Sequence, residues 1–600
     1  MKQYTISEIE SILSETSGSK FAFDESDKKR ALTNQSTSEL RKALSRDGDR
    51  FRGTPIPELP FSSFKRFDID GDRKDFEGYY LERRRRLLTF SLLVWLYRRE
   101  EDIAELENIV WAILNEYTWV LPAHLSRPRN KNGAITPERV SLSELQEDGY
   151  IIDLFSAETA SALAEMLSLV GDMLSPIIVK RIHLYVKNRI FDVINAPFNW
   201  KNSTSNWSAV CGGACGIAAI YLEKDTRKLA EIIKVSLDAI NKFVSGYTDD
   251  GCCIEGMSYW IYGFGYFTYF ADLLCKRTNG IINLFDDPKI AKMAEFPQKC
   301  FLAGNGILYF SDTGTTLALS PSLPSYLSKI YKNVSIPPIA CLMVDDYSDN
   351  CSRFALGVRD FIWTDENLSE NAMTTFGTHI LQNAQWYIAS SENGIGIAAK
   401  AGGNNEPHNH NDVGSFHIYK NGRMTLADVG SGEYVKNYFG PHRYEFFPTS
   451  SAAHNVPIIN GKFQSAGAER SATDTVITKD GICTDIARTY DDEALKSLKR
   501  SISFDAKSGG VTIEDNYDFS VVPTSVTERF VSFDKPIITP GKILIGGTEG
   551  SALYYDLDVL EASFARVPYS GPSGVPMEAY TIDLSLKRPS TKFSVKFNIT

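Results

Sequence analysis

The chain has 600 residues, with 75 acidic and 64 basic side chains and a formal net charge of −11. A chain of this length exceeds what a single hydrophobic core supports, so we expect two or more domains. The acidic balance excludes a general attraction to nucleic acid or to an anionic membrane surface. No stretch of the sequence approaches the roughly eighteen apolar residues of a membrane-spanning helix.

The N-terminal segment, MKQYTISEIESILSETSGSK, is polar and mixed in charge. It lacks the apolar core of a secretory signal peptide. The nine cysteines, an odd number, are scattered along the chain. These features together predict a cytoplasmic protein with reduced thiols rather than a disulfide framework.

Amphipathic helices are predicted through the first part of the chain, where apolar residues recur at three- and four-residue spacing. The predicted helical segments are 87–97, 103–114, 157–170, 176–194, 214–222, 229–244 and 258–274. A long run of helical hairpins forms either a solenoid or a closed α/α toroid. Since no fixed-period repeat is present, the toroid is favoured.

After about residue 375 the hydrophobic period changes to two, which indicates short strands. The predicted strands are 385–390, 395–400, 415–420, 423–428, 511–514, 524–533, 552–559 and 592–598, with Asn421-Gly422 as a hairpin turn between two of them. Many strands without intervening helices predict an antiparallel sandwich or barrel.

The predicted fold class is therefore α+β with two domains, an N-terminal (α/α) toroid followed by an antiparallel β-sandwich. We place the toroid at 1–370, with an N-terminal extension over about 1–75, and the sandwich at 371–600. The linker is expected within 343–380, where the sequence is polar.

Histidine is scarce, and five of the eight histidines lie between residues 408 and 454. In an extended HNHND segment, His408 and His410 share a face, so one could bind a metal while the other serves as an acid or base. His410, Asp428 and His454 would offer two nitrogens and one carboxylate oxygen, which suits zinc with one open position. The alternative is a polar loop whose histidines bond to the backbone, and the clustering weighs against it.

Two segments of the helical part carry polar groups among aromatic and small residues. Tyr259 and Tyr262, in EGMSYWIYG, are three residues apart and would share one helical face, a spacing more often typical of core packing. Glu255 before them is typical of a helix start. Asn206, in SNWSAVCGGACG, would by itself be a cap or turn residue before a run that suits close packing. No strand precedes this run, so it is not a nucleotide-binding motif.

Taken together, these motifs resemble the heparinase II/III-like polysaccharide lyases. Asn206 and Trp207 with the small-residue helix, the EGMSYW segment, and HNHND with the later His454-Asn455 are similar to segments of that family. TWVLPAH, which contains His124, is similar to a toroid segment of the same proteins. The resemblance spans roughly residues 75 to 465 and implies the same architecture, a toroid followed by a β-sandwich.

The resemblance implies β-elimination at a uronic acid within a polysaccharide. Removal of the proton on carbon 5, alpha to the carboxylate, creates an enolate-like dianion that must be neutralised. Asn206, helped by His124 or an arginine, fits the neutralising role. Tyr259 and His408 fit as the acid–base pair, and which of them is the base depends on whether the elimination is syn or anti.

The resemblance also implies substrate contacts and a bracing metal. Besides His124, the expected substrate-binding residues are Trp207, Glu255, Tyr262 (the alternative tyrosine) and Arg443 (for the substrate carboxylate). The His410, Asp428 and His454 set would hold a structural zinc ion that braces the loop presenting His408. No organic cofactor is expected. Pro407 departs from the family pattern, in which some relatives carry a polar residue before the histidine.

Three hypotheses follow for function. The first is a lyase acting on short anionic oligosaccharides, because an acidic protein attracts long polyanions poorly. The second is a hydrolase, either with paired carboxylates (Glu255 with Asp250 or Asp412) or with water activated by a metal at the His/Asp cluster. The third is an inactive carbohydrate-binding homologue. The expected partner is an anionic glycan, without nucleic acid or membrane, and a homodimer is compatible with the sequence.

Overall fold

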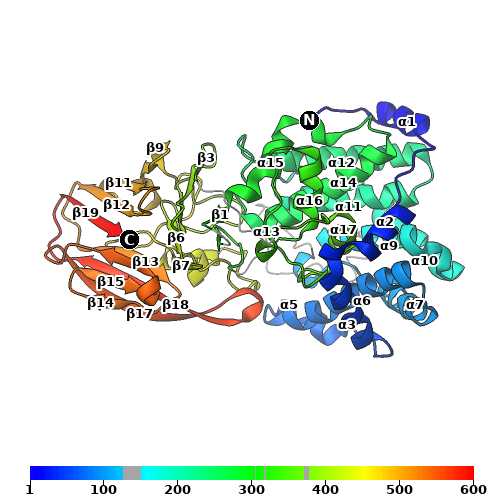
Figure 1. Ribbon diagram of the computed structural model, residues 1–600, viewed down its shortest axis with the longest axis horizontal. Coiled ribbons are helices and arrows are strands. Elements are labelled where there is room, and N and C mark those ends of the chain that lie inside the picture. Colours follow the sequence, from blue (N-terminus) through cyan, green and yellow to red (C-terminus); the bar gives the residue numbers. More distant parts are fainter. Residues whose placement is uncertain (126–150, 304–305, 316–318, 370–376) are drawn as a thin grey trace. The chain divides into compact units, whose positions relative to one another are not determined.

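The structure is a computed structural model that describes residues 1–125, 151–303, 306–315, 319–369 and 377–600. It divides into two units, one helical and one made of strands (Figure 1). The helical unit comprises Met1–Tyr247, Tyr259–Ala294 and Ala318–Ser369, and the β unit comprises Thr248–Ser258, Glu295–Leu317 and Glu370–Thr600. Two segments of the N-terminal part thus belong to the β unit. The predicted domain boundary at 370/371 lies outside the described residues.

Helices make up the regular structure of the N-terminal part. Their bounds are α1 (Ile6–Glu15), α2 (Glu25–Thr33), α3 (Ser38–Phe51), α4 (Phe61–Phe64), α5 (Arg66–Ile69), α6 (Lys74–Tyr97), α7 (Glu100–Leu114), α9 (Leu154–Val170), α10 (Pro176–Val186), α11 (Asn206–Leu222), α12 (Thr226–Gly246), α13 (Met257–Tyr259), α14 (Gly265–Arg277), α15 (Pro288–Lys299), α16 (Ser322–Ile330) and α17 (Phe354–Trp363). Each helix predicted from periodicity overlaps a helix of the structure, although the segments predicted over 176–194 and 258–274 each contain a π turn, η4 (Lys187–Phe191) and η6 (Trp260–Phe264). Helices α1 to α5 occupy the first seventy or so residues.

Helix α11 packs against α9, α12 and α14, and residues 208–220 of this helix are buried on every side. The small-residue run makes this packing possible. A Cβ atom at Gly213 would lie 3.0 Å from the carbonyl oxygen of Tyr266 in α14, so a side chain there would force the two helices to shift. Asn206, at the first turn of α11, therefore belongs to a closely packed, buried helix.

The β unit contains antiparallel sheets. One sheet has the order β3 (Gly377–Leu381), β4 (Trp386–Ser390), β5 (Ile395–Lys400), β6 (Phe416–Lys420), β7 (Arg423–Leu426). A larger one has the order β14 (Ile537–Thr539), β15 (Lys542–Ile545), β16 (Ser551–Tyr554), β19 (Lys592–Ile599), β12 (Val511–Phe519), β11 (Leu495–Phe504), β10 (Gly481–Asp485), β9 (Thr473–Thr478). A third has the order β17 (Leu560–Ser570), β18 (Pro576–Leu586), β13 (Val526–Ser532), β8 (Ile458–Ile459), and β1 (Phe301–Leu302) pairs with β2 (Gly306–Ile307).

The strands enclose a large apolar core, which includes residues from Tyr387 in β4 to Ile599 in β19. A smaller apolar cluster is formed by Val429, Ala453, Val531 and Ala579. Strands β11 and β12 bury mostly alternate residues, as expected for a sheet with one face on the core. Strands β4 and β5 are buried throughout. This central sheet leads directly into the loops that carry the histidine cluster.

Local predictions in the β unit hold with two corrections. Asn421 and Gly422 both have positive φ, 48° and 85°, which is the turn that an Asn-Gly hairpin requires. Strand β7 ends at Leu426, so Asp428 lies beyond the strand that it was predicted to end. The strand predicted at 552–559 ends at Tyr554, where a turn precedes β17. Among the described residues, no helix is both long and apolar enough to cross a membrane.

Candidate active site and metal centre

In the helical unit, Asn206 lies against the tyrosine segment. Asn206 is the first residue of α11 and is 2% exposed. The neighbouring turn is η6 (Trp260–Phe264), and a Cβ atom at its Gly263 would lie 3.1 Å from the Asn206 Cβ. The fold therefore brings the predicted asparagine next to the turn that follows Tyr259.

His124 joins the same part of the unit. It ends the turn η2 (Pro122–His124), and its ring centroid lies 5.0 Å from the ring of Trp207. Its Nδ1 atom is 2.9 Å from Oδ2 of Asp153, which also caps α9. A carboxylate only accepts hydrogen bonds, so Nδ1 carries the proton and Nε2 is the acceptor of the neutral ring. Asp153 thus fixes the tautomer of His124.

The two predicted tyrosines have different surroundings. The continuous helix predicted over 258–274 is interrupted by η6, a π turn, which changes the residue spacing after Tyr259. Tyr259 is half-buried, whereas Tyr262 is 8% exposed and lies under the guanidinium group of Arg353, 3.7 Å from the ring centroid. Burial and then the charge of Glu158 raise the pKa of Tyr262 well above its ordinary value. Tyr262 is therefore a neutral phenol held in the helical core.

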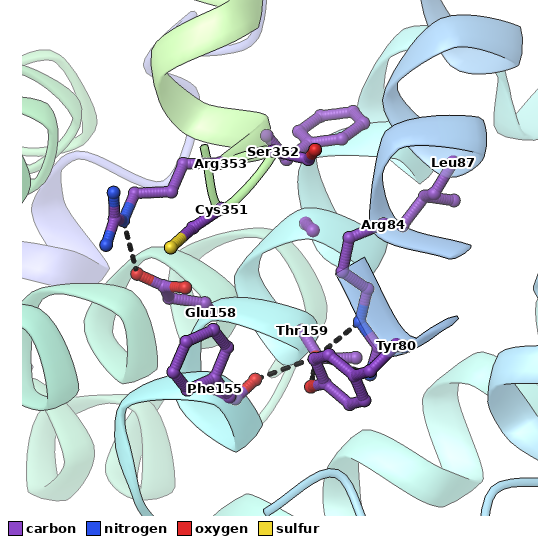
Figure 2. A pocket seen from close by; sticks show the side chains of 11 residues that line it. Tyr80, Arg84, Leu87, Phe155, Glu158, Thr159, Cys351, Ser352 and Arg353 are labelled. Carbon is purple, nitrogen blue, oxygen red and sulfur yellow. Dashed lines mark hydrogen bonds and ion pairs between the residues drawn. The ribbon is translucent and has the colours of Figure 1, made fainter. Parts of the chain in front are cut away.

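Glu158 and Arg353, which both interact with Tyr262, line a small cavity of the helical unit (Figure 2). They form an ion pair on the cavity wall, with Nε of Arg353 3.3 Å from Oε1 of Glu158. Burial raises the pKa of Glu158 to about 7, although the charge of Arg353 opposes the shift. Phe155, which also lines the cavity, lies 5.6 Å from the His124 ring, centroid to centroid.

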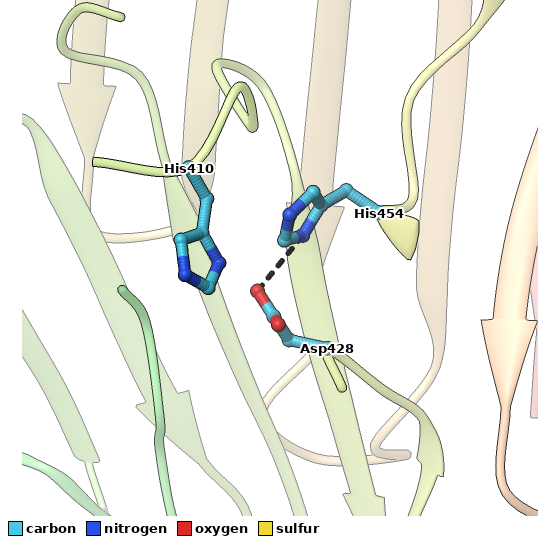
Figure 3. Close-up of side chains that lie close together, drawn as sticks. All are labelled: His410, Asp428 and His454. Atoms are coloured by element: carbon cyan, nitrogen blue, oxygen red, sulfur yellow. Dashed lines mark ion pairs between the residues drawn. The ribbon is translucent and has the colours of Figure 1, made fainter. Parts of the chain in front are cut away.

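In the β unit, the three residues predicted as metal ligands form one buried cluster (Figure 3). One potential ligand atom from each of His410, Asp428 and His454 lies within 4.8 Å of the others. His454 donates from Nε2 to the carbonyl oxygen of Pro448 at 3.1 Å, and its Nδ1 is 2.9 Å from Asp428 Oδ2. The other Asp428 oxygen accepts the amide of Gly430 at 2.8 Å.

Asp428 and His454 each stabilise the charged form of the other within this cluster. Burial alone would raise the pKa of Asp428, but the charge of His454 and hydrogen bonds from His417 and His454 outweigh it and lower that pKa. Burial alone would lower the pKa of His454, but Asp428 outweighs it and raises that pKa. An ionised carboxylate between imidazoles is a donor set that could hold a metal ion.

Asp312 is the residue that sequence reasoning missed. Its side chain is fully buried. Its Oδ2 atom accepts hydrogen bonds from Nδ1 of His408 at 2.8 Å and from Nη2 of Arg443 at 2.9 Å. Its Oδ1 atom accepts from Nε2 of His410 at 3.0 Å and from the hydroxyl of Tyr438 at 2.8 Å. One carboxylate therefore joins the predicted acid–base histidine to a predicted metal ligand.

The pKa of Asp312 follows from these contacts. Burial acts to raise it, but the hydrogen bonds from His408 and His410 and the charge of Arg443 prevail and hold the pKa well below its usual range. Asp312 is thus an ionised group in the interior of the β unit. Such a group is stable only when donors surround it, and here four donors do so.

The position of Asp312 in the chain explains why it was missed. It precedes His408 by 96 residues and lies in a segment that the sequence assigns to the helical part. The Glu255-Gly256 segment packs against the same stretch, since Ser311 donates to the carbonyl of Ile254 at 3.1 Å. Gly256 has φ of +99°, and a Cβ atom there would lie 2.8 Å from the carbonyl oxygen of Phe310. Glu255, which is buried, therefore belongs to the β unit beside the Asp312 stretch.

The geometry of the HNHND loop differs from the expected extended strand. His408 has φ of +55°, a left-handed backbone, so strict alternation of side chains does not apply. His408 and His410 converge instead because both contact Asp312. The side chain of His408 is 17% exposed, whereas that of His410 is fully buried, with no hydrogen-bond partner for Nδ1 among the described residues.

Arg443 holds this loop from one side. Besides its bond to Asp312, it donates from Nε to the carbonyl of Asn409 at 3.0 Å and from Nη1 to that of Tyr438 at 3.1 Å. Its guanidinium group is thus engaged with protein groups on all three nitrogens. Through these contacts Arg443 fixes the 408–411 loop.

The remaining two histidines of the sequence cluster differ from each other. His417 is buried with Nε2 3.8 Å from Oδ2 of Asp428, next to the metal-ligand cluster. His442 is exposed and pairs with Glu445 at 2.7 Å. The histidines that cluster in the sequence therefore include both buried and exposed members, which the sequence did not distinguish.

No protein-family profile matches the sequence, and no curated protein matches it. Solved structures do match. A heparinase III aligns with a TM-score of 0.57 and 13% identity over 96% of this chain and 93% of that chain. Heparan sulfate lyase HepC from Pedobacter heparinus aligns with a TM-score of 0.55 and 11% identity over 94% and 88%. A Streptomyces coelicolor A3 chondroitin AC lyase, in complex with chondroitin sulphate, aligns with a TM-score of 0.50 and 9% identity over 99% and 82%.

The chain has the heparinase III fold. The predicted fold class, a helical toroid followed by antiparallel β-sheets, is confirmed by this match over nearly the whole chain. At these identities the likeness is one of fold.

Proposed function

We propose that the protein is a polysaccharide lyase that cleaves uronate-containing glycans by β-elimination and leaves a 4,5-unsaturated uronate end. The observation that carries this proposal is the contact between His408 and Asp312 within a chain that has a lyase fold. Asp312 accepts the proton of Nδ1, so the neutral ring presents Nε2 as its acceptor. A partly exposed histidine held in one tautomer is suited to proton transfer.

In this proposal Asn206 neutralises the substrate carboxylate. Its amide lies at the N-terminal end of α11, where the helix dipole favours a negative charge. His124, oriented by Asp153, is the second donor that we assign to this charge. Donors of this kind stabilise the developing dianion, and losing one costs roughly 2.7–4 kcal/mol.

In the same proposal Tyr259 and His408 transfer the protons. We propose that one removes the proton on carbon 5 and that the other protonates the departing oxygen on carbon 4 of the same sugar. We prefer Tyr259 to Tyr262 because Tyr262 is buried under Arg353 with a raised pKa. Trp207, half-buried beside His124, is suited to stack against a sugar ring.

We further propose that His410, Asp428 and His454 bind zinc. His454 donates from Nε2 to a backbone carbonyl and His410 donates from Nε2 to Asp312, so each ring directs Nδ1 into the cluster. Nδ1 of His454 faces the Asp428 carboxylate and would release its proton when a metal binds. When bound, the ion would supply a fixed positive charge that braces the loop bearing His408. Arg443 acts as a positioning residue for this loop, and Glu255 remains an expected substrate contact.

Metal-assisted hydrolysis is the second candidate, because a three-ligand set leaves room for a water molecule on zinc. Hydrolysis by paired carboxylates has less support. Asp250 accepts the backbone amide of Asn383 at 2.7 Å. Asp412 pairs with the buried Lys400 at 2.9 Å. Both carboxylates are thus committed to protein contacts.

The test is incubation with defined heparan, chondroitin, hyaluronan and alginate oligosaccharides in water enriched in ¹⁸O. Elimination gives an ultraviolet-absorbing product without solvent oxygen, whereas hydrolysis incorporates ¹⁸O and gives no chromophore. Short oligosaccharides are expected to be the better substrates, given the net charge of −11. Binding without any product across all four series would indicate a carbohydrate-binding protein and overturn the proposal.

A further inference from the structure

Asp312 has a role that goes beyond supporting one histidine. We propose that it is a positioning residue that couples the metal centre to His408, by fixing His408 and His410 in opposite tautomers. The significance for catalysis rests on the proposed lyase function. The coupling itself rests only on contacts within the β unit.

The Asp312 carboxylate accepts hydrogen bonds from four side-chain donors. Each oxygen of Asp312 accepts two donors: Oδ2 from His408 and Arg443, and Oδ1 from His410 and Tyr438. An ionised carboxylate has no proton to donate, so each imidazole nitrogen facing it must carry one.

The two histidines face Asp312 with different nitrogens. His408 uses Nδ1 at 2.8 Å, so its acceptor in the neutral ring is Nε2. His410 uses Nε2 at 3.0 Å, so its acceptor is Nδ1, which is buried and lies in the metal-ligand cluster. A single carboxylate thus selects the nitrogen that would react in one ring and the nitrogen that would bind metal in the other.

The coupling follows from this shared acceptor. A cation on Nδ1 of His410 makes the opposite N–H a stronger donor, which tightens its bond to Oδ1 of Asp312. The carboxylate that this bond orients is the same one that orients His408. Metal binding is therefore expected to restrict the His408 ring, although His408 is not a ligand.

Arg443 and Tyr438 hold Asp312 in place for this task. Arg443 bonds to Oδ2 and also to the carbonyl of Asn409, the residue between the two histidines. Tyr438 donates to Oδ1 and accepts the amide of Gly432 at 2.9 Å. Arg443 thus fixes the Asp312 carboxylate and the backbone of the 408–411 loop to each other.

The decisive variant is Asp312→Asn. An amide group retains the size but replaces one acceptor oxygen with an NH₂ donor, so it cannot accept from both imidazoles and from Tyr438 and Arg443. At least one histidine must change tautomer or lose its bond. We expect Zn²⁺ affinity to fall roughly 10–100-fold, and kcat to fall with KM little changed.

The primary readout is ¹⁵N NMR of histidine-labelled protein with and without Zn²⁺, with the His408 signals assigned from a His408→Gln variant. In the wild-type chain we expect His408 to carry its proton on Nδ1, with a sharper signal after Zn²⁺ is added. Asp312→Asn is expected to shift this tautomer and to abolish the response to Zn²⁺. An unchanged His408 tautomer with unchanged Zn²⁺ affinity would overturn the proposal.

The matched control is Asp515→Asn, the same substitution at another buried aspartate of the β unit, which pairs with Arg500 at 2.7 Å. It should leave the His408 signal and Zn²⁺ affinity as in the wild type, and an equal effect there would reduce Asp312 to a general stabilising charge. If Asp312→Asn fails to fold, Tyr438→Phe removes one donor from Oδ1 and should weaken Zn²⁺ binding in the same direction. If the wild type yields no unsaturated product while the tautomer and affinity changes occur, the lyase proposal fails and the coupling stands.

Discussion

Each unit of this protein holds a histidine with a predicted functional role, His124 or His408, whose Nδ1 is bonded to an aspartate, and these two pairs differ in their surroundings. In the helical unit, Asp153 accepts a hydrogen bond from Nδ1 of His124, which lies 29 residues earlier in the chain, and Asp153 also caps α9. In the β unit, Asp312 accepts a hydrogen bond from Nδ1 of His408, which lies 96 residues later in the chain, and it accepts from three further donors. In the first pair the carboxylate also caps a helix. In the second pair the carboxylate is shared by four side-chain donors, two of which are histidines.

Replacement of the two histidines tests this difference most directly. His408→Gln should lower kcat by about 10²–10⁴-fold, the usual contribution of a general acid or base. His124→Gln should have a smaller effect, because His124 shares carboxylate neutralisation with Asn206. The exposed His442→Gln is the control and should leave turnover unchanged. Equal losses at His408 and His124 would remove the distinction between the two pairs.

The different roles proposed for Tyr259 and Tyr262 in the helical unit can be tested by removing each hydroxyl group. Tyr259→Phe should lower kcat by about 10²–10⁴-fold if its hydroxyl transfers a proton. Tyr262→Phe removes a hydroxyl of the same type three residues later, in the core under Arg353, and should alter stability more than turnover. Steady-state kinetics and thermal unfolding of both variants provide the measurement. The reverse ranking would assign the catalytic role to Tyr262.

Asn206→Ala should lower kcat by roughly 10²–10³-fold, because the variant loses a donor to the developing dianion. Asn241→Ala, on the neighbouring helix α12, is the matched control, since its amide donates to the carbonyl of Leu237 within the same helix at 2.9 Å. Product formation followed in the ultraviolet measures both. Wild-type rates in Asn206→Ala would exclude this residue from carboxylate neutralisation.

Metal removal should affect the units unequally. Zn²⁺ at 100 times its Kd would stabilise the folded β unit by about 2.7 kcal/mol, so chelation should lower the Tm of that unit. The unfolding of the helical unit should be unaffected, because the ligands belong to the β unit. Calorimetry with and without chelator, followed by Zn²⁺ addition, checks this. Lost activity with unchanged unfolding would favour a catalytic metal instead of a bracing one.

The smallest expected effect concerns pH and the helical unit. The pKa of Glu158 is raised from 4.5 to about 7, so the folded state binds a proton that the unfolded state has released between these values. Stability should therefore fall as pH rises from 4.5 to 7. Glu158→Gln mimics the protonated form and should flatten this dependence. Urea unfolding across that range measures it, and a steeper fall in the variant would contradict the assignment.

The sequence also predicted much of the local structure, because its signals are short-range. The helices of the first part follow from apolar spacing, and the β6–β7 hairpin follows from Asn421-Gly422. The prediction failed where a local pattern was broken by packing. The helix expected over 258–274 contains a π turn, and His408 has a left-handed backbone in place of an extended one.

What the sequence by itself determined is the set of residue types and their local order: a helical part, a strand-rich part, and His410, Asp428 and His454 within one short stretch. Only the tertiary structure decided which carboxylate orients His408. Asp312 comes from a distant segment that joins the β unit, and contacts between residues 96 positions apart leave no periodicity or spacing in the chain. Such a pairing is selected by burial, because an ionised side chain in the interior must be surrounded by donors wherever in the sequence they arise.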